Sequence, residues 1–211
     1  MKAILFDLDG TLLNTLDDLA DAVNATLTHF GCPVRTTEEV RQFVGNGAER
    51  LIRLALPGKN DDPEAAKVLA YFKDYYAAHA QIKTCPYNGI LEALAEIQKE
   101  FPVAIVSNKP DGAVKLLCRQ YFGDIYALGE SNACPRKPAP DMVHKAMEAI
   151  GAQSCIYVGD SEVDVVTAKN AGVPCLSVLC GFRDRNALEE AGAAYFCEDP
   201  KDLLKALKEM I

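Results

Sequence analysis

Apolar residues in the second half of the chain form short runs that alternate with stretches of helical periodicity. In each helical stretch, apolar positions recur three or four residues apart, as in a helix with one buried face. Strands and helices that alternate in this way predict a parallel sheet with right-handed crossovers and helices on both faces. The expected strands span 102–107, 125–128, 154–158 and 173–178. One expected helix begins near residue 111, a second begins near 140, a third ends near 171, and a fourth spans 199–210.

The segment from residue 15 to 84 has a different pattern, because each periodic stretch in it is helical. An apolar stripe indicates a first helix from residue 16 to 27. Thr36 and Glu39 then have the spacing of a capping box that opens a second helix. Further helices are expected over 48–56 and from Asp62 to about residue 80. An all-helical insert therefore interrupts the α/β core just after its first strand.

Composition narrows the class of protein. The 211 residues carry a formal net charge of −8 without a basic run, which argues against nucleic-acid or acidic-membrane partners. The eight cysteines contain no C-x-x-C pair, and several fall in apolar stretches, as reduced and buried thiols do. No apolar run is long enough to span a membrane. We therefore expect a cytoplasmic protein with reduced thiols.

The N-terminal apolar strand ends in two carboxylates, Asp7 and Asp9, which precede a Gly10-Thr11 turn. Alternate residues of a strand share a face, so the two side chains could converge on one small charged group. Carboxylates this close repel each other unless a divalent cation or a shared proton lies between them. A strand that ends in a polar turn has the same pattern, so this segment alone leaves both interpretations open.

Three further polar features follow predicted strands. Ser107 ends one strand, Lys137 lies in a proline-rich loop, and Asp160 and Asp164 follow another strand. Each has a structural alternative, such as a helix cap for Ser107 or Asp160 and a solvated loop cation for Lys137. Functional sites of parallel sheets form at the carboxyl ends of the strands, so the four features together predict one site at that edge.

The chain resembles the haloacid dehalogenase-like superfamily of phosphohydrolases in four motifs. These motifs are Asp7-x-Asp9-Gly-Thr, Ser107, Lys137 and Gly159-Asp160-x-x-x-Asp164. The resemblance covers essentially the whole chain. It implies an α/β fold with a Rossmann-like parallel sheet core, residues 1–14 and 85–211, and an inserted all-helical cap domain, residues 15–84. It also implies hinges near 14–15 and 84–86, about which the cap opens and closes.

The same resemblance implies roles for four catalytic residues. Asp7 would attack phosphorus and form an aspartyl-phosphate. Asp9 would protonate the leaving oxygen and then deprotonate the attacking water. Ser107 and Lys137 would hold the phosphoryl oxygens. Asp9 also favours phosphoryl chemistry over dehalogenation, because the dehalogenase branch of the family lacks this second aspartate.

Mg²⁺ is the cofactor that the resemblance implies, since this hard cation prefers oxygen ligands. The expected metal-binding residues are Asp7, Asp9 through its backbone carbonyl, and Asp160. Asp164 is expected to support these ligands rather than to be an obligatory ligand itself.

Substrate residues are suggested by three segments that look most like those of phosphoglycolate phosphatases: Gly45-Asn46-Gly47-Ala48, Ser107-Asn108-Lys109-Pro110 and the Lys137-Pro-x-Pro loop. A Gly-x-Gly loop that opens a helix can offer backbone N–H groups to a carboxylate. Equally, Gly45 could simply end one helix and Gly47 could start the next. The candidate substrate-binding residues are Thr11, Gly45, Asn46, Gly47, Ala48, Arg50, Asn108 and Lys109, and Arg183 could also contribute positive charge.

The favoured function is Mg²⁺-dependent hydrolysis of a small phosphorylated metabolite, with 2-phosphoglycolate as the substrate. Glu162-Val163 and the lack of an aromatic residue just before Gly181-Phe182 depart from the pattern of that subfamily. Pyrophosphatase or nucleotidase activity, a phosphomutase of the β-phosphoglucomutase type, and a binding protein that has lost catalysis remain alternatives. A monomer or a weak homodimer is expected.

Overall fold

The computed structural model describes residues 1–58, 65–131 and 134–211. The chain forms two units, one made of Met1–Asn14 with Pro86–Ile211 and the other of Thr15–Cys85. Two short strands, β2 (Leu13–Asn14) and β3 (Cys85–Pro86), pair where the chain passes from one unit to the other. All eight cysteines are free thiols.

The first unit contains a six-stranded sheet in the order β5-β4-β1-β6-β7-β8, and the five strand pairings are parallel. This confirms the predicted α/β class. The predicted strands are present, whereas the short last strand was not predicted. The strands are β1 (Lys2–Phe6), β4 (Val103–Pro110), β5 (Tyr126–Glu130), β6 (Ser154–Gly159), β7 (Cys175–Val178) and β8 (Tyr195–Cys197).

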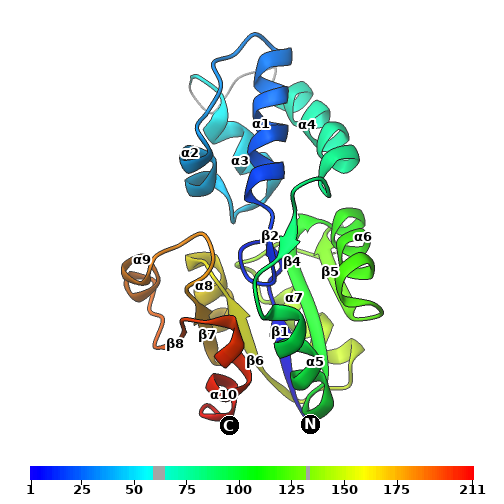
Figure 1. The fold of residues 1–211 in the computed structure, drawn as a ribbon, viewed down its shortest axis with the longest axis vertical. Coiled ribbons are helices and arrows are strands. Elements are labelled where there is room, and N and C mark those ends of the chain that lie inside the picture. The colour runs from blue at the N-terminus through cyan, green and yellow to red at the C-terminus, as the bar shows by residue number, and fades with distance from the viewer. Residues whose placement is uncertain (59–64, 132–133) are drawn as a thin grey trace. The chain divides into compact units, whose positions relative to one another are not determined.

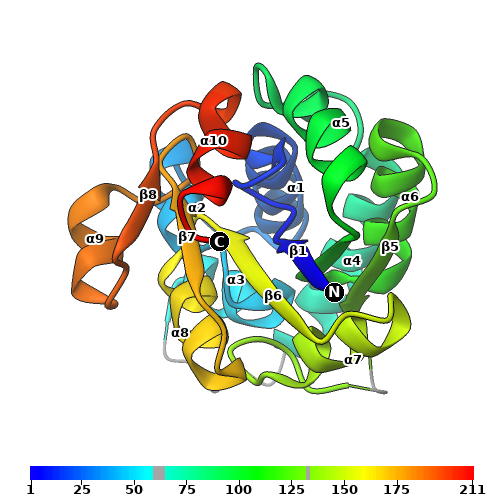
Figure 2. The same ribbon diagram turned by 90° about the horizontal axis from the view of Figure 1, so that it is seen from below.

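Helices cover both faces of this sheet (Figure 2). Alternate residues of β1 face opposite sides, so Ile4 and Phe6 belong to one apolar cluster and Ala3 and Leu5 to another. Helices α5, α6 and α10 contribute to the first cluster, and α7 and α8 contribute to the second. The helices are α5 (Ile90–Glu100), α6 (Asp111–Phe122), α7 (Asp141–Ala149), α8 (Glu162–Ala171), α9 (Arg185–Glu190) and α10 (Leu203–Lys208).

The second unit is helical in its described part (Figure 1). It contains α1 (Leu16–His29), α2 (Thr37–Phe43), α3 (Gly47–Ala55) and α4 (Ala65–His79). The Thr36 capping box is confirmed, because Glu39 donates its N–H to Thr36 Oγ1 and accepts the Thr36 N–H at 2.8 Å. The predicted helix start at Asp62 lies outside the described residues, and a cap function for this unit stays a prediction.

A buried carboxylate ties the two ends of this helical unit together. Asp18, in the first turn of α1, accepts hydrogen bonds from the backbone N–H groups of Ile82, Lys83 and Thr84. Asp18 is 2% exposed, so these bonds are shielded from water. In the part of the chain that the structure describes, no helix has the length and apolar character needed to cross a membrane.

Candidate active site

Polar side chains gather where three neighbouring strands end. Asp7 directly follows β1, Ser107 lies in the last half of β4, and Asp160 directly follows β6. Strands β4 and β6 pair with β1 on its two sides, so their carboxyl ends meet at one edge of the sheet. Lys137 reaches the same place from the loop between β5 and α7. These four sequence-predicted residues therefore come together.

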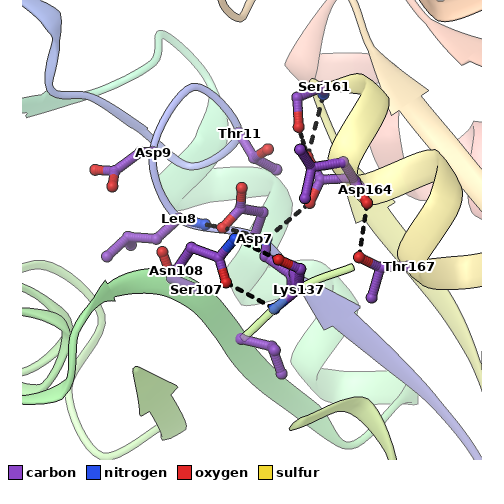
Figure 3. A network of polar contacts seen from close by, with 12 residues as sticks. Asp7, Leu8, Asp9, Thr11, Ser107, Asn108, Lys137, Ser161, Asp164 and Thr167 are labelled. Carbon is purple, nitrogen blue, oxygen red and sulfur yellow. Dashed lines mark hydrogen bonds and ion pairs between the residues drawn. The ribbon is translucent and has the colours of Figure 1, made fainter. Parts of the chain in front are cut away.

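The Lys137 ammonium lies at the centre of a buried network (Figure 3). It contacts Asp7 Oδ1 at 2.9 Å and Asp164 Oδ1 at 2.7 Å. It also donates a hydrogen bond to the Tyr157 hydroxyl at 3.0 Å, and that hydroxyl donates to the Val106 carbonyl at 3.2 Å. The Lys137 side chain is 1% exposed, so the network fixes a desolvated positive charge next to Asp7.

Asp164 holds two parts of this edge together. Its Oδ1 faces Lys137, while its Oδ2 accepts hydrogen bonds from the Ser161 hydroxyl at 2.6 Å and the Ser161 N–H at 3.1 Å. Asp164 and Ser161 form the capping box of α8, and a Cβ on Gly159 would lie 2.6 Å from Asp164 Oδ2. A glycine is therefore required where β6 passes this carboxylate.

Asp160 is held by backbone and side-chain donors. Thr11 Oγ1 donates to its Oδ1 at 3.0 Å, and the Phe182 N–H donates to its Oδ2 at 2.8 Å. Gly10 has a φ of +83°, and a Cβ on it would lie 2.6 Å from Asp160 Cγ. The Gly10-Thr11 turn thus packs directly on this carboxylate, which explains why a glycine stands there.

The electrostatics of the cluster follow from burial. Burial and the neighbouring Asp164 raise the pKa of Asp7 to about 7, although Lys137 lowers it. Burial, together with the carboxylates of Asp164 and Asp7, also raises the pKa of Asp160 well above its usual range. Burial alone would lower the pKa of Lys137, but Asp164 and Asp7 raise it well above its ordinary value. When these carboxylates are ionised, they carry more buried negative charge than Lys137 offsets.

A divalent cation fits this charge balance. One oxygen from each of Asp7, Asp160 and Asp164 lies within 4.8 Å of the other two. These three negative charges and the one positive charge of Lys137 leave two negative charges in the ionised cluster. Oxygen donors suit Mg²⁺ or Ca²⁺ rather than a soft metal. The donor set thus fits the Mg²⁺ that the sequence resemblance implied.

Asp9 has a separate partner, and its carboxylate points away from the network around Asp7 (Figure 3). Lys109 Nζ lies 2.7 Å from Asp9 Oδ1 and 2.9 Å from Oδ2. The neighbouring Asn108 donates to the Lys137 carbonyl at 3.0 Å and accepts the Lys137 N–H at 2.8 Å. Asn108 and Lys109 were predicted to bind substrate, and the structure gives both side chains partners within the protein.

Thr11, also predicted to bind substrate, lies at the acidic cluster, where it donates to Asp160, whereas five other candidates lie elsewhere in the chain. Gly45, Asn46, Gly47, Ala48 and Arg50 belong to the helical unit, at the turn from α2 into α3. Their predicted contact with substrate stays untested. In the first unit, Arg183 pairs with Glu162, 2.8 Å from Arg183 Nε to Glu162 Oε2.

Three residues of the site were missed from the sequence. Tyr157, Ser161 and Phe182 each contact a carboxylate or ammonium group of the cluster. A tyrosine two residues before Gly159, on an otherwise apolar strand, is a signal that could have pointed to Tyr157. Ser161 stands three residues before Asp164 in the spacing of a capping box. Phe182 acts through its backbone N–H, for which no residue type is diagnostic.

Comparisons with known proteins place the chain among related sequences and folds. The phosphoglycolate phosphatase of Pseudomonas putida is 34% identical over 214 residues, which is 96% of this chain and 78% of that protein. The enzyme of the same name from Vibrio parahaemolyticus is 33% identical, over 98% of this chain and 96% of its own length.

Solved structures with a similar fold include two proteins that cover nearly the whole chain. A protein from Lactobacillus delbrueckii subsp. bulgaricus, assigned to the phosphoglycolate phosphatases, superposes with a TM-score of 0.91 at 34% identity and covers 97% of both chains. CbbY from Rhodobacter sphaeroides, solved in complex with phosphate, has a TM-score of 0.80 at 25% identity, over 98% of both chains. The family model for haloacid dehalogenase-like hydrolases matches residues 4–178. The chain belongs to the haloacid dehalogenase-like hydrolase family.

Proposed function

We propose that the protein is a Mg²⁺-dependent phosphatase that hydrolyses 2-phosphoglycolate to glycolate and phosphate through an aspartyl-phosphate. The observation that carries the proposal is the Asp7 carboxylate at the end of β1, paired at 2.9 Å with the buried ammonium of Lys137. A nucleophile that attacks a phosphate dianion needs such a positive charge beside it to offset repulsion. The names of the relatives support the choice of substrate.

In the first step, an Asp7 oxygen attacks phosphorus while the bond from phosphorus to the ester oxygen breaks. Asp9, which must enter this step protonated, gives its proton to the departing oxygen, so the product leaves as an alcohol. Ser107 and Lys137 hold the phosphoryl oxygens. Both are 2% exposed, and in such a water-poor site a fixed charge and hydroxyl dipole act strongly.

In the second step, Asp9 takes a proton from water, and the water oxygen attacks phosphorus. The bond from phosphorus to the Asp7 oxygen breaks, which releases phosphate and regenerates the Asp7 carboxylate. Asp7 and Asp160 would hold Mg²⁺, while Asp164 keeps Lys137 and Ser161 in place. When bound, the cation neutralises charge on the phosphoryl oxygens and orients the ester.

Substrate selection extends this proposal to the helical unit. We propose that the turn at Gly45–Ala48 and the side chain of Arg50 bind the substrate carboxylate. Gly45 and Gly47 have φ values of +124° and +83°, conformations that other residues rarely adopt. The Asn46 side chain makes no capping hydrogen bond to α3. We further propose that this unit acts as a cap, which excludes water during phosphoryl transfer.

The experiment is phosphate release with and without Mg²⁺ from 2-phosphoglycolate, pyrophosphate, nucleoside monophosphates and sugar phosphates. Asp7→Asn serves as the blank. A strong preference for 2-phosphoglycolate that requires both Mg²⁺ and Asp7 is expected. Preference for another compound would be consistent with the mechanism but would overturn the assignment of 2-phosphoglycolate as the substrate. No release from the whole panel would overturn the phosphatase and leave a phosphomutase, which interconverts sugar phosphates without releasing phosphate, as the next assay.

A further inference from the structure

We propose that Lys109 is a positioning residue for Asp9: it holds Asp9 in place as the protonated acid gives its proton to the ester oxygen, and it pairs with the carboxylate that this transfer leaves. This inference rests on the proposed phosphatase function. It assigns Lys109 a task different from the substrate contact that the sequence suggested. Lys137 serves Asp7 and the phosphoryl group, and Lys109 serves Asp9.

Both oxygens of Asp9 face the same ammonium, at 2.7 and 2.9 Å from Lys109 Nζ. The Lys109 side chain is 2% exposed and that of Asp9 is 14% exposed, so water screens this pair weakly. A desolvated ammonium is costly without a partner, which makes the pairing a strong restraint on both side chains. A contact to both oxygens also fixes the orientation of the carboxylate plane, and not only its distance.

The backbone of Lys109 is itself held on two sides. Its N–H donates to Ser107 Oγ at 3.3 Å. On the side of β5, a Cβ on Gly129 would lie 2.7 Å from the Lys109 carbonyl oxygen, so the two backbones pack closely there. The β4–β5 register shifts between Val106 and Pro110. Irregular pairing of this kind redirects side chains next to active sites, and here it aims Lys109 at Asp9 across the strand ends.

Asp9 lacks comparable support from its own segment. It stands at the start of the Gly10 turn, after β1 has ended, and its carboxylate lies outside the network that holds Asp7, Asp160 and Asp164. Lys109 thus supplies the orientation that neighbouring strands supply to the other carboxylates. Without it, the Asp9 side chain would sample several rotamers, and proton transfer depends on close geometry.

Two esters with different leaving groups can distinguish a role of Lys109 in proton transfer from a merely structural role. Glycolate departs from 2-phosphoglycolate as a basic alkoxide unless Asp9 protonates it, whereas p-nitrophenolate is a stable anion that departs without a proton. The comparison uses kcat/KM, because it reports only the steps up to departure of the leaving group. The second step, in which Asp9 activates water, is common to both esters and does not enter kcat/KM.

The experiment measures kcat/KM for 2-phosphoglycolate and p-nitrophenyl phosphate, with Mg²⁺, in Lys109→Met, Asp9→Asn and the double variant. General acids contribute roughly 10²–10⁴-fold. Lys109→Met is therefore expected to lose on the order of 10²-fold with 2-phosphoglycolate and far less with p-nitrophenyl phosphate. In the Asp9→Asn background, the same change should add less than about threefold, since coupled residues are not additive.

Two variants guard against misfolding. Lys109→Arg keeps the charge and is expected to recover part of the activity toward 2-phosphoglycolate. Lys115→Met removes an exposed lysine on α6 that pairs with Asp111 and is expected to leave both rates unchanged.

The possible failures are distinct. Equal losses with both esters in Lys109→Met would overturn the inference and point to direct phosphoryl contact by Lys109. Additive losses in the double variant would also overturn it. A wild-type protein that hydrolyses neither ester would overturn the proposed phosphatase and this inference with it.

Discussion

Asp7 and Asp9 stand two residues apart, and each has its own lysine. Lys137 contacts Asp7 at 2.9 Å, and Lys109 contacts Asp9 at 2.7 Å. The two ion pairs separate the two carboxylates chemically. Asp7 belongs to a buried cluster with excess negative charge, whereas Asp9 is balanced by an ammonium of its own. The two carboxylates therefore have different surroundings, as groups with different tasks in the proposed mechanism require.

The raised pKa of Asp7 predicts a dependence of stability on pH in the metal-free protein. An unfolded aspartate has a pKa of about 3.9, and the pKa of Asp7 in the folded protein is about 7. Between these values the folded state binds more protons than the unfolded state, so stability falls as the pH rises from about 4 to 7. Asp7→Asn removes this titration and should be stabilising near pH 7.5 but not near pH 4.

Thermal unfolding of the wild type and Asp7→Asn, with EDTA at several pH values, measures the difference. A shift of about 2–4 °C accompanies each kcal/mol in a protein of this size. Saturating Mg²⁺ should stabilise the wild type more than the variant, because the cation neutralises the ionised cluster. A difference between the two proteins that is constant across the pH range would contradict the assignment of this charge to Asp7.

Tyr157 provides a second prediction at this scale. Tyr157→Phe removes the hydroxyl that accepts from Lys137 and donates to the Val106 carbonyl. The buried carbonyl then lacks this donor, so the free energy of unfolding should fall by about 1–3 kcal/mol. Denaturant unfolding measures the change. Tyr195→Phe, at an exposed position on β8, is the matched control and should be neutral. An equal loss in both variants would argue against the network.

At the residue level, the sequence reveals the side chains that end strands but not their partners. Asp7, Ser107 and Asp160 could be found because each follows or ends an apolar run. Tyr157 resembles an ordinary core residue, and nothing in the sequence pairs Lys109 with a carboxylate 100 positions away. Such contacts depend on which strands become neighbours, and short-range patterns do not contain that information.

Among the elements, the Asp18 carboxylate connects α1 to the segment that follows α4. Asp18→Ala would leave the N–H groups of Ile82, Lys83 and Thr84 without their acceptor. We expect a loss of about 2–3 kcal/mol in the free energy of unfolding, since a charged and buried acceptor is removed. Denaturant unfolding, with Asp17→Ala at the neighbouring exposed position as control, tests this. Equal stability of the two variants would contradict it.

The turn from α2 into α3 carries a prediction about substrate. Arg50 is exposed on α3, and Arg50→Gln removes its charge without a buried contact being lost. If Arg50 reads the substrate carboxylate, KM for 2-phosphoglycolate should rise by roughly 10-fold, the worth of one charged hydrogen bond. KM for ethyl phosphate, which has no carboxylate, should not change. Steady-state kinetics with the two esters measures both, and Arg53→Gln on the same helix is the control.

Element prediction succeeded where periodicity was strong. The parallel strands of the core and the Thr36 capping box were read correctly, because alternation and cap spacing are local properties. The last strand, β8, was missed because Tyr195–Cys197 is only three residues long and partly exposed. It exists through its pairing with β7, which the sequence of the strand itself does not reveal.

For the molecule as a whole, the family and the α/β class agree with the sequence resemblance, and the acidic cluster fits the divalent cation that it implied. The cap function of the helical unit stays a prediction, because it concerns how two units act together during turnover. The identity of the substrate also stays a proposal, because the candidate residues for the substrate carboxylate belong to the helical unit. The reaction type depends on the first unit alone, where Asp7, Lys137 and Asp160 already form one cluster.

The most direct test of the central claim is detection of the phosphorylated form of Asp7. The protein is mixed with 2-phosphoglycolate and Mg²⁺, quenched in acid within the turnover time, treated with borohydride and analysed by peptide mass spectrometry. Borohydride reduces an aspartyl-phosphate to homoserine, so homoserine at position 7 is predicted, with none in Asp7→Asn. Phosphate release without homoserine at position 7 would contradict nucleophilic attack by Asp7.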